Sequence, residues 1–168
     1  KNSIMNRILL LLMAALMVST STFGQNIVLE IDGDDLYYSE PGCSDCFSSS
    51  DPRWRNRLVV LGTNYDWNVD REDISCGWQG ITNFGWYNPS TVAYGTNAVM
   101  QINGSESDGG LCFGDDNVCG GYNTVRTVAT TSLVPCQWHY FTDSRTCDIG
   151  TYGVDWSIYW KYAFSPTL

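Results

Sequence analysis

Apolar and polar residues alternate along much of the chain after residue 24. The clearest case is GVDWSIYWKYAF, in which one side of an extended chain carries Val154, Trp156, Ile158, Trp160 and Tyr162. Successive side chains of a strand point to opposite faces, so this pattern predicts a half-buried antiparallel strand. The same period recurs in NIVLEI, WRNRLVV, TNAVMQI and NTVRTVATTSL, whereas no long stretch has apolar residues at helical spacing.

Clusters of turn-forming residues separate these segments, namely IDGDD, SEPGCSDC, NPS, INGSESDGG and CFGDDNVCGG. Short strands between Gly- and Asp-rich turns predict an all-β fold, an antiparallel β-sandwich of jelly-roll or immunoglobulin-like topology. Residues 25–163 are enough for a single domain with one core. We read residues 164–168, which end in SPTL, as the start of a linker to a further part of the protein.

The first 24 residues have the three-part pattern of a secretory signal peptide. Lys1 and Arg7 precede the apolar run Ile8–Val18, and small polar residues follow up to Gly24. The run has 11 residues, whereas a membrane-spanning helix takes roughly 20. We therefore predict cleavage after Gly24, an extracellular or cell-surface location, and no membrane insertion of the mature chain.

The part of the chain after residue 24 is strongly acidic, because it holds all 18 acidic residues and seven of the nine basic ones, for a net charge of −11. Such a charge repels nucleic acid and anionic lipid. Arg53, Arg55 and Arg57 do cluster, but they alternate with Trp54 and Asn56. We interpret them as the solvated face of a strand, and we expect no nucleic-acid partner.

Seven cysteines follow residue 24, at positions 43, 46, 76, 112, 119, 136 and 147. In an exported chain cysteines are first read as disulfides, and the odd count leaves one free or paired with another chain. Short loops favour two pairs and leave a third with two options: Cys112–Cys119, Cys136–Cys147, and Cys76 with Cys43 or Cys46. Zinc binding or redox chemistry by CSDC is disfavoured in an oxidising compartment.

Acidic residues in two of the turn clusters raise the question of calcium. Asp115 and Asp116 in CFGDDNVCGG, with Asp32 and Asp34 in IDGDD, offer the oxygen ligands that calcium prefers. No segment has the regular spacing of a calcium-binding loop. Solvated turns are therefore the favoured interpretation, and calcium bound between the loops at one end of the sandwich is the alternative.

The sequence offers little for catalysis. His139, in PCQWHYF, is the only histidine, and no Gly-x-Ser-x-Gly motif supplies a nucleophile, so a Ser-His-Asp triad is disfavoured. An acid pair suited to glycoside hydrolysis cannot be recognised from spacing alone. We expect a protein that is not an enzyme.

Aromatic residues are the more informative signal. The stretch DISCGWQGITNFGWYNPS holds Trp78, Phe84, Trp86 and Tyr87 without clean alternation, which predicts a long loop carrying rings. Exposed rings stack on the apolar faces of sugars, while neighbouring polar groups bind the hydroxyls. The alternative is that these rings cover an open end of the core.

Four segments, CGWQG, LCFGDDNVCGG, PCQWHYF and VDWSIYWKY, carry a resemblance to a known group of domains. They resemble cysteine-containing β domains near the N-terminus of large exported or surface proteins of Bacteroidetes-type bacteria. In those domains an Asp-Asp turn beside a cysteine precedes a Cys-x-Trp segment and a final aromatic strand. The similarity covers most of residues 50–163; it implies an extracellular or adhesion context and assigns no binding residue.

Together these observations predict a secreted, non-enzymatic surface or adhesion module. It would bind polysaccharide or another surface protein through Trp78, Phe84, Trp86 and Tyr87. Two alternatives stay open. One is a structural spacer of a larger surface protein, in which the rings belong to the core, and the other is a small secreted glycoside hydrolase that uses two acids.

Overall fold

The computed structural model describes residues 25–39, 51–71, 81–106, 119–147 and 150–163. Within these ranges the chain is almost entirely β-strand, as its alternating pattern predicts. The elements are β1 (Asn26–Ser39), β2 (Pro52–Val60), β3 (Thr63–Asp70), β4 (Ile81–Ala93), β5 (Asn97–Glu106), β6 (Asn123–Ala129), a short 3-10 helix η1 (Thr130–Ser132), β7 (Trp138–Cys147) and β8 (Gly150–Tyr162).

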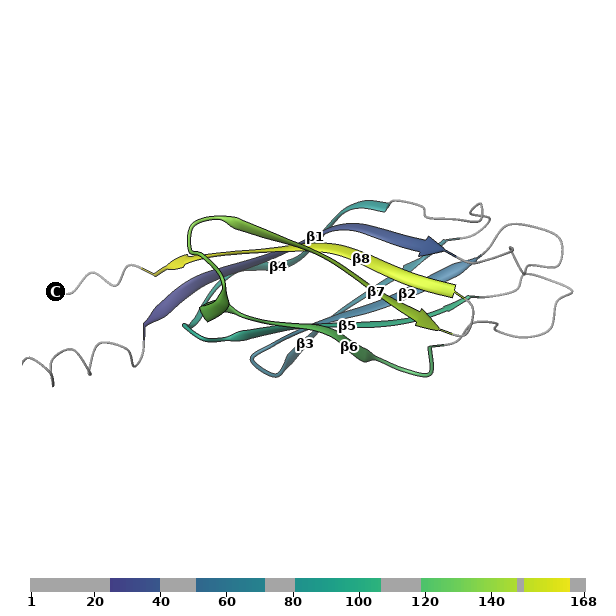
Figure 1. Ribbon diagram of the computed structural model, residues 1–168, viewed down its shortest axis with the longest axis horizontal. Helices are drawn as coiled ribbons and strands as arrows, with labels where there is room; N and C mark the ends of the chain where they lie inside the picture. Colours follow the sequence, from purple (N-terminus) through teal and green to yellow (C-terminus); the bar gives the residue numbers. More distant parts are fainter. Residues whose placement is uncertain (1–24, 40–50, 72–80, 107–118, 148–149, 164–168) are drawn as a thin grey trace, which may run out of the picture.

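The eight strands form two four-stranded sheets packed face to face (Figure 1). The first sheet has the order β4-β1-β8-β7 and the second the order β3-β2-β5-β6, with every neighbouring pair antiparallel. The predicted antiparallel β-sandwich is confirmed. Of the two topologies left open by the sequence, the immunoglobulin order of strands ABED against CFG is not the one observed.

The core lies between the sheets and is built from the alternating positions of each strand. Trp156 and Ile158 of β8 belong to the same buried cluster as Trp54 and Leu58 of β2, and all four side chains are fully buried. Burial of a large apolar side chain contributes about 1.5–3 kcal/mol, so this core is the main source of stability. Arg53, Arg55 and Arg57 share the outward face of β2, as their alternation predicts, and each is half-buried.

Close contact between the sheets requires a glycine at position 104. A Cβ atom built on Gly104 of β5 would lie 2.6 Å from the ring of Tyr152, which is a fully buried residue of β8. The Tyr152 ring in turn packs at 5.0 Å from Tyr38. The two sheets can therefore approach at this position only because residue 104 has no side chain.

Both ends of the described domain lie at the same end of the sandwich (Figure 1). Ala163 N donates to Asn26 O at 3.0 Å, and Tyr94 N donates to Gln25 O at 2.8 Å. The start of β1 and the end of β8 are therefore neighbours in the first sheet. The two residues of the described disulfide, Cys119 and Cys147, lie at the opposite end.

That disulfide corrects the pairing expected from the sequence. Cys119 is bonded to Cys147, with 4.7 Å between their Cα atoms, and Cys136 is free and exposed. The pairs Cys112–Cys119 and Cys136–Cys147 are wrong. Strand β7 separates Cys136 from Cys147 by about 30 Å at the usual rise of a strand. Cys43, Cys46, Cys76 and Cys112 lie outside the described residues.

The inner side of β7 joins the first sheet to the second through three alternate residues. Asp143 accepts from Arg126 Nε of β6 at 2.7 Å and from Trp156 Nε1 at 2.7 Å. Arg145 donates to the backbone oxygens of Ile102, Cys119 and Gly121. Cys147 completes the series with its disulfide.

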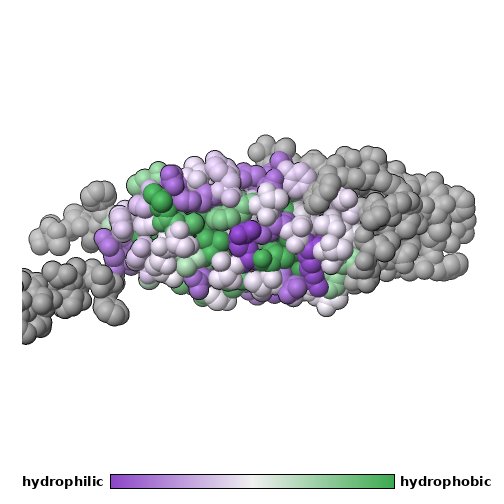
Figure 2. Space-filling view, in the orientation of Figure 1, coloured by the Kyte–Doolittle hydropathy of each residue, from purple (hydrophilic) through white to green (hydrophobic). Residues whose placement is uncertain are grey.

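The β6 and β7 edge of the sandwich faces the viewer in Figure 2. Hydrophobic residues gather along the middle of this edge, between the two sheets, among hydrophilic residues. The contacts of Asp143 and Arg145 therefore hold the sheets together at an edge where apolar surface is visible.

Three segments predicted as turns or loops lie wholly or partly in strands. The first five residues of INGSESDGG belong to β5. IDGDD lies inside β1, where a register shift between Gly33 and Asp35 marks a β-bulge with Asp34 as the extra residue. NPS and most of the predicted aromatic loop lie inside β4. The turn prediction is wrong for IDGDD because the outward face of this sheet accommodates acids, and a bulge absorbs the break in alternation.

Candidate functional site

The outward face of the first sheet brings acidic, hydroxyl and aromatic residues into three parallel columns. The pairing of β1, β8 and β7 sets them in rows: Glu30 beside Tyr159 beside Trp138, then Asp32 beside Ser157 beside Tyr140, then Asp35 beside Asp155 beside Thr142. We call these nine residues, with Asp34 and Tyr37 of β1, the acid–aromatic face. Neighbouring strands are about 5 Å apart and successive rows about 7 Å, so the face suits an extended ligand.

Three rings stand on the β7 and β8 side of the acid–aromatic face. Trp138 and Tyr159 are half-buried and lie next to each other, with ring centroids 5.5 Å apart and planes tilted by 41°. Tyr140 is 72% exposed, more than any other large hydrophobic residue of the described chain. A tyrosine ring kept in water on the outward side of the edge strand β7 is available to a ligand.

A tyrosine holds two carboxylates together on the β1 side. Tyr37 Oη lies 2.7 Å from Asp155 Oδ2 and 3.1 Å from Asp35 Oδ2. The hydrogen bond to Asp155 is the main reason why the pKa of Tyr37 lies above its usual value, followed by burial and the bond to Asp35. The other oxygen of each carboxylate, Oδ1, is buried and has no hydrogen-bond partner.

The bulge residue Asp34 adds a further carboxylate to the same face. Burial raises its pKa above the ordinary 3.8, and the negative charges of Asp32, Asp35 and Asp155 raise it further, while a hydrogen bond with Ser157 acts in the opposite direction. Repulsion from the neighbouring acids of the face therefore contributes to this shift, after burial. A positive group placed among them would relieve that repulsion.

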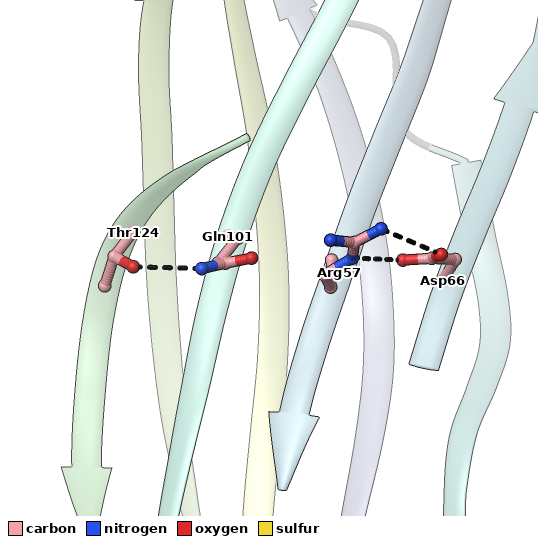
Figure 3. Close-up of polar contacts among 4 residues, drawn as sticks. All are labelled: Arg57, Asp66, Gln101 and Thr124. Carbon is pink, nitrogen blue, oxygen red and sulfur yellow. Dashed lines mark hydrogen bonds and ion pairs between the residues drawn. The ribbon is translucent and has the colours of Figure 1, made fainter. Parts of the chain in front are cut away.

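The outward face of the second sheet differs because Asp66 and Asp70 of β3 are paired with arginines of β2. Figure 3 shows Arg57 of β2 bonded to Asp66 of β3, and Gln101 of β5 bonded to Thr124 of β6. Arg57 also lies over the ring of Tyr122, 3.9 Å from its centroid. These bonds link β2 with β3 and β5 with β6, and they occupy the carboxylate of Asp66.

The structure places the predicted calcium ligands only in part. Asp32 and Asp34 lie together on the acid–aromatic face, whereas Asp115 and Asp116 lie outside the described residues. Within residues that the structure describes, no group of three or more acids, histidines or cysteines has the arrangement to hold a metal ion. Calcium at the loop containing Asp115 stays a prediction.

The structure describes the side chain of only one of the four predicted ligand-binding rings. Tyr87 is buried and its ring packs edge-on against Tyr65 at 5.1 Å, so it belongs to the core and is not an exposed binding ring. Phe84 and Trp86 belong to β4, opposite β1, and their side chains lie outside what the structure describes. Trp78 lies outside the described residues altogether.

The rings of the acid–aromatic face were not singled out by the sequence, although their signals are present. Tyr159 falls on the polar side of the alternation in GVDWSIYWKYAF, and Trp138 and Tyr140 alternate with His139 in PCQWHYF. His139 itself is half-buried and bonds through Nε2 to Val134 O at 2.8 Å.

Comparisons with known proteins give no family for the chain: no family model matches it, and no curated protein matches it either. The described residues contain no helix that is long and apolar enough to cross a membrane.

Proposed function

We propose that the protein is an exported, non-enzymatic binding module that holds a polysaccharide on its acid–aromatic face. The observation that carries the proposal is that exposed and half-exposed rings of β7 and β8, namely Trp138, Tyr140 and Tyr159, share one outward sheet face with the carboxylates of β1. The signal-peptide pattern and the Cys119–Cys147 disulfide support export to an oxidising space.

The two kinds of side chain have separate roles in sugar binding. The rings of β7 and β8 offer apolar surface for the C–H faces of sugar rings, which gives affinity. Carboxylates and hydroxyls of β1 and β8, among them Asp32 and the Tyr159 hydroxyl, accept and donate hydrogen bonds to sugar hydroxyls, which gives orientation. A chain of sugars laid across the rows would use both at once.

The acid pair Asp35 and Asp155 supports binding better than hydrolysis. A glycosidase needs one carboxyl group to protonate the leaving oxygen and another to attack or to activate water. Here both acids share the Tyr37 hydroxyl through one oxygen, and their second oxygens are buried. We expect no turnover across a broad panel of chromogenic glycosides.

The spacer alternative fits the geometry less well. In a spacer of a linear array, the polypeptide chain enters the domain at one end and leaves it at the opposite end. Here Asn26 and Ala163 are hydrogen-bonded neighbours. A domain attached through either or both of these ends projects the rest of the sandwich away from the attachment. Such a placement suits a module that presents a binding face.

Retention on insoluble polysaccharides tests the proposal. The wild-type chain should be retained by at least one polymer of a broad set, and Tyr140→Ala should weaken retention about 3- to 10-fold, the equivalent of about 0.5–1.5 kcal/mol for a ring contact. Tyr122→Ala, which removes a ring from the opposite sheet, is the matched control and should keep wild-type retention. Equal losses in both variants, or no retention by any polymer, would count against the proposal.

A further inference from the structure

We propose that the polysaccharide bound by the acid–aromatic face carries positively charged amino groups. This inference rests on the proposed function and names the class of its ligand. The occupant is a polymer of amino sugars, and the argument is charge complementarity on a sheet face with no described partner.

Almost all of the charged side chains on the acid–aromatic face are negative. It holds five carboxylates, which are Glu30, Asp32, Asp34, Asp35 and Asp155. Among the described residues of β1, β7 and β8, Lys161 is the one basic residue on this side of the sheet, beside Val28 in the next row. Arg145 of β7 points inward. An anionic polymer such as a polyuronate would be repelled there, and a cationic one attracted.

Of these five carboxylates, Glu30 and Asp32 are the ones offered to a ligand, because Asp35 and Asp155 bond to Tyr37 and Asp34 bonds to Ser157. The ion pairs of the described residues are Arg55–Asp70, Arg57–Asp66 and Arg126–Asp143. None of them uses an acid of the acid–aromatic face. The chain thus neutralises acids on one outward face and leaves those on the other without a basic partner.

The distances between the columns suit an amino sugar. The acids of β1 and the rings of β7 are separated by one strand, β8, and so by about 10 Å. A sugar ring stacked over Trp138 and Tyr159 can direct an equatorial ammonium group toward Glu30 in the same row or Asp32 in the next. Burial is the main cause of the raised pKa of Asp34, and the negative charges of Asp32, Asp35 and Asp155 add to it; an ammonium group would offset that added part.

Three polymers test the inference at a mildly acidic pH where amines are protonated: chitosan, chitin, which has the same backbone with acetylated amines, and alginate, which is anionic. The wild-type chain should bind chitosan about tenfold or more tightly than chitin, as expected for a charge-assisted contact. It should not bind alginate. The double variant Glu30→Gln with Asp32→Asn should lose most of that preference.

A matched control separates a specific contact from the attraction of net charge. The double variant Asp66→Asn with Asp70→Asn changes the net charge by the same amount on the opposite face, and it should keep the preference for chitosan. Equal losses in the two double variants would overturn the inference. Binding of chitin without preference for chitosan would overturn it while leaving the proposed function intact, and absence of binding to every polysaccharide would overturn both.

Discussion

Asp143 is the residue that most directly couples the two sheets at their β6 and β7 edge. Its carboxylate is almost fully buried and accepts from Arg126 of the second sheet and from Trp156 of the first. A buried carboxylate needs such partners, because an unpaired charge away from water is strongly unfavourable. The site is therefore both a bond between sheets and a point of vulnerability.

We expect Asp143→Asn to destabilise the fold by about 1–3 kcal/mol, because it leaves the Arg126 guanidinium beside a neutral amide. Chemical denaturation of the variant and the wild type measures the difference. Asp66→Asn makes the same change in an exposed pair and should cost less than about 1 kcal/mol. Equal effects of the two substitutions would mean that the contact between the sheets contributes no more than a surface ion pair.

At the residue scale, the sequence predicts which positions share a face but not always which face is buried. Val154, Trp156 and Ile158 were correctly placed in the core because their alternate neighbours are polar. In PCQWHYF both faces carry rings, so alternation alone could not show that Tyr140 is exposed. Only the pairing of β7 with β8 settles that question.

At the scale of single elements, β1 shows how a strand tolerates an acidic interruption. Its inward positions run through Ile27, Leu29 and Ile31, shift at the Asp34 bulge, and resume at Leu36. The break in alternation at IDGDD resembles a turn in the sequence. The distinction depends on the partners β4 and β8, which continue past the bulge on both sides.

The raised pKa of Asp34, the bulge residue, predicts how the stability of the fold depends on pH. A pKa that is raised in the folded state means that protonated Asp34 favours folding, so this contribution is complete below the ordinary value of 3.8 and is lost as the pH rises through the raised value. Asp34→Asn should therefore match the wild type in acid and exceed its stability near neutrality. Urea midpoints measured over this range provide the test, and a difference that does not change with pH would contradict the assignment.

Strand β7 explains why the cysteine pairing could not be predicted. Pairing by short separation in the sequence assumes that the chain folds back locally, whereas β7 carries Cys147 to the far end of the sandwich, where Cys119 begins the approach to β6. Spatial proximity here follows from the order of the strands. The odd cysteine expected from the count does appear among the described residues, as the free Cys136.

We expect peptide mapping under non-reducing conditions to yield a peptide that links Cys119 with Cys147, and alkylation of the native protein to label Cys136. Replacing both disulfide cysteines by serine should lower stability by about 3–4 kcal/mol, the chain-entropy value for a separation of 28 residues. A linked Cys136–Cys147 peptide would contradict the structure.

At the scale of the whole molecule, the sandwich has one outward face with balanced charge and one without. Pairs such as Arg57–Asp66 neutralise the second sheet, whereas the first sheet gathers five carboxylates beside three rings. The strongly acidic composition is readable from the sequence, but its concentration on one sheet is not. That asymmetry arises because four of the five carboxylates lie on β1, at the centre of the first sheet, whereas the arginine cluster lies on β2 of the second.

The most direct test of the account is a map of backbone amide shifts by NMR as a retained polysaccharide fragment is added. Binding to the acid–aromatic face predicts the largest shifts at Trp138, Tyr140 and Tyr159, with the second sheet almost unchanged at Arg57 and Gln101. Largest shifts on the second sheet, or none on β7 and β8 while the ligand binds, would contradict the central claim that the first sheet presents the binding surface.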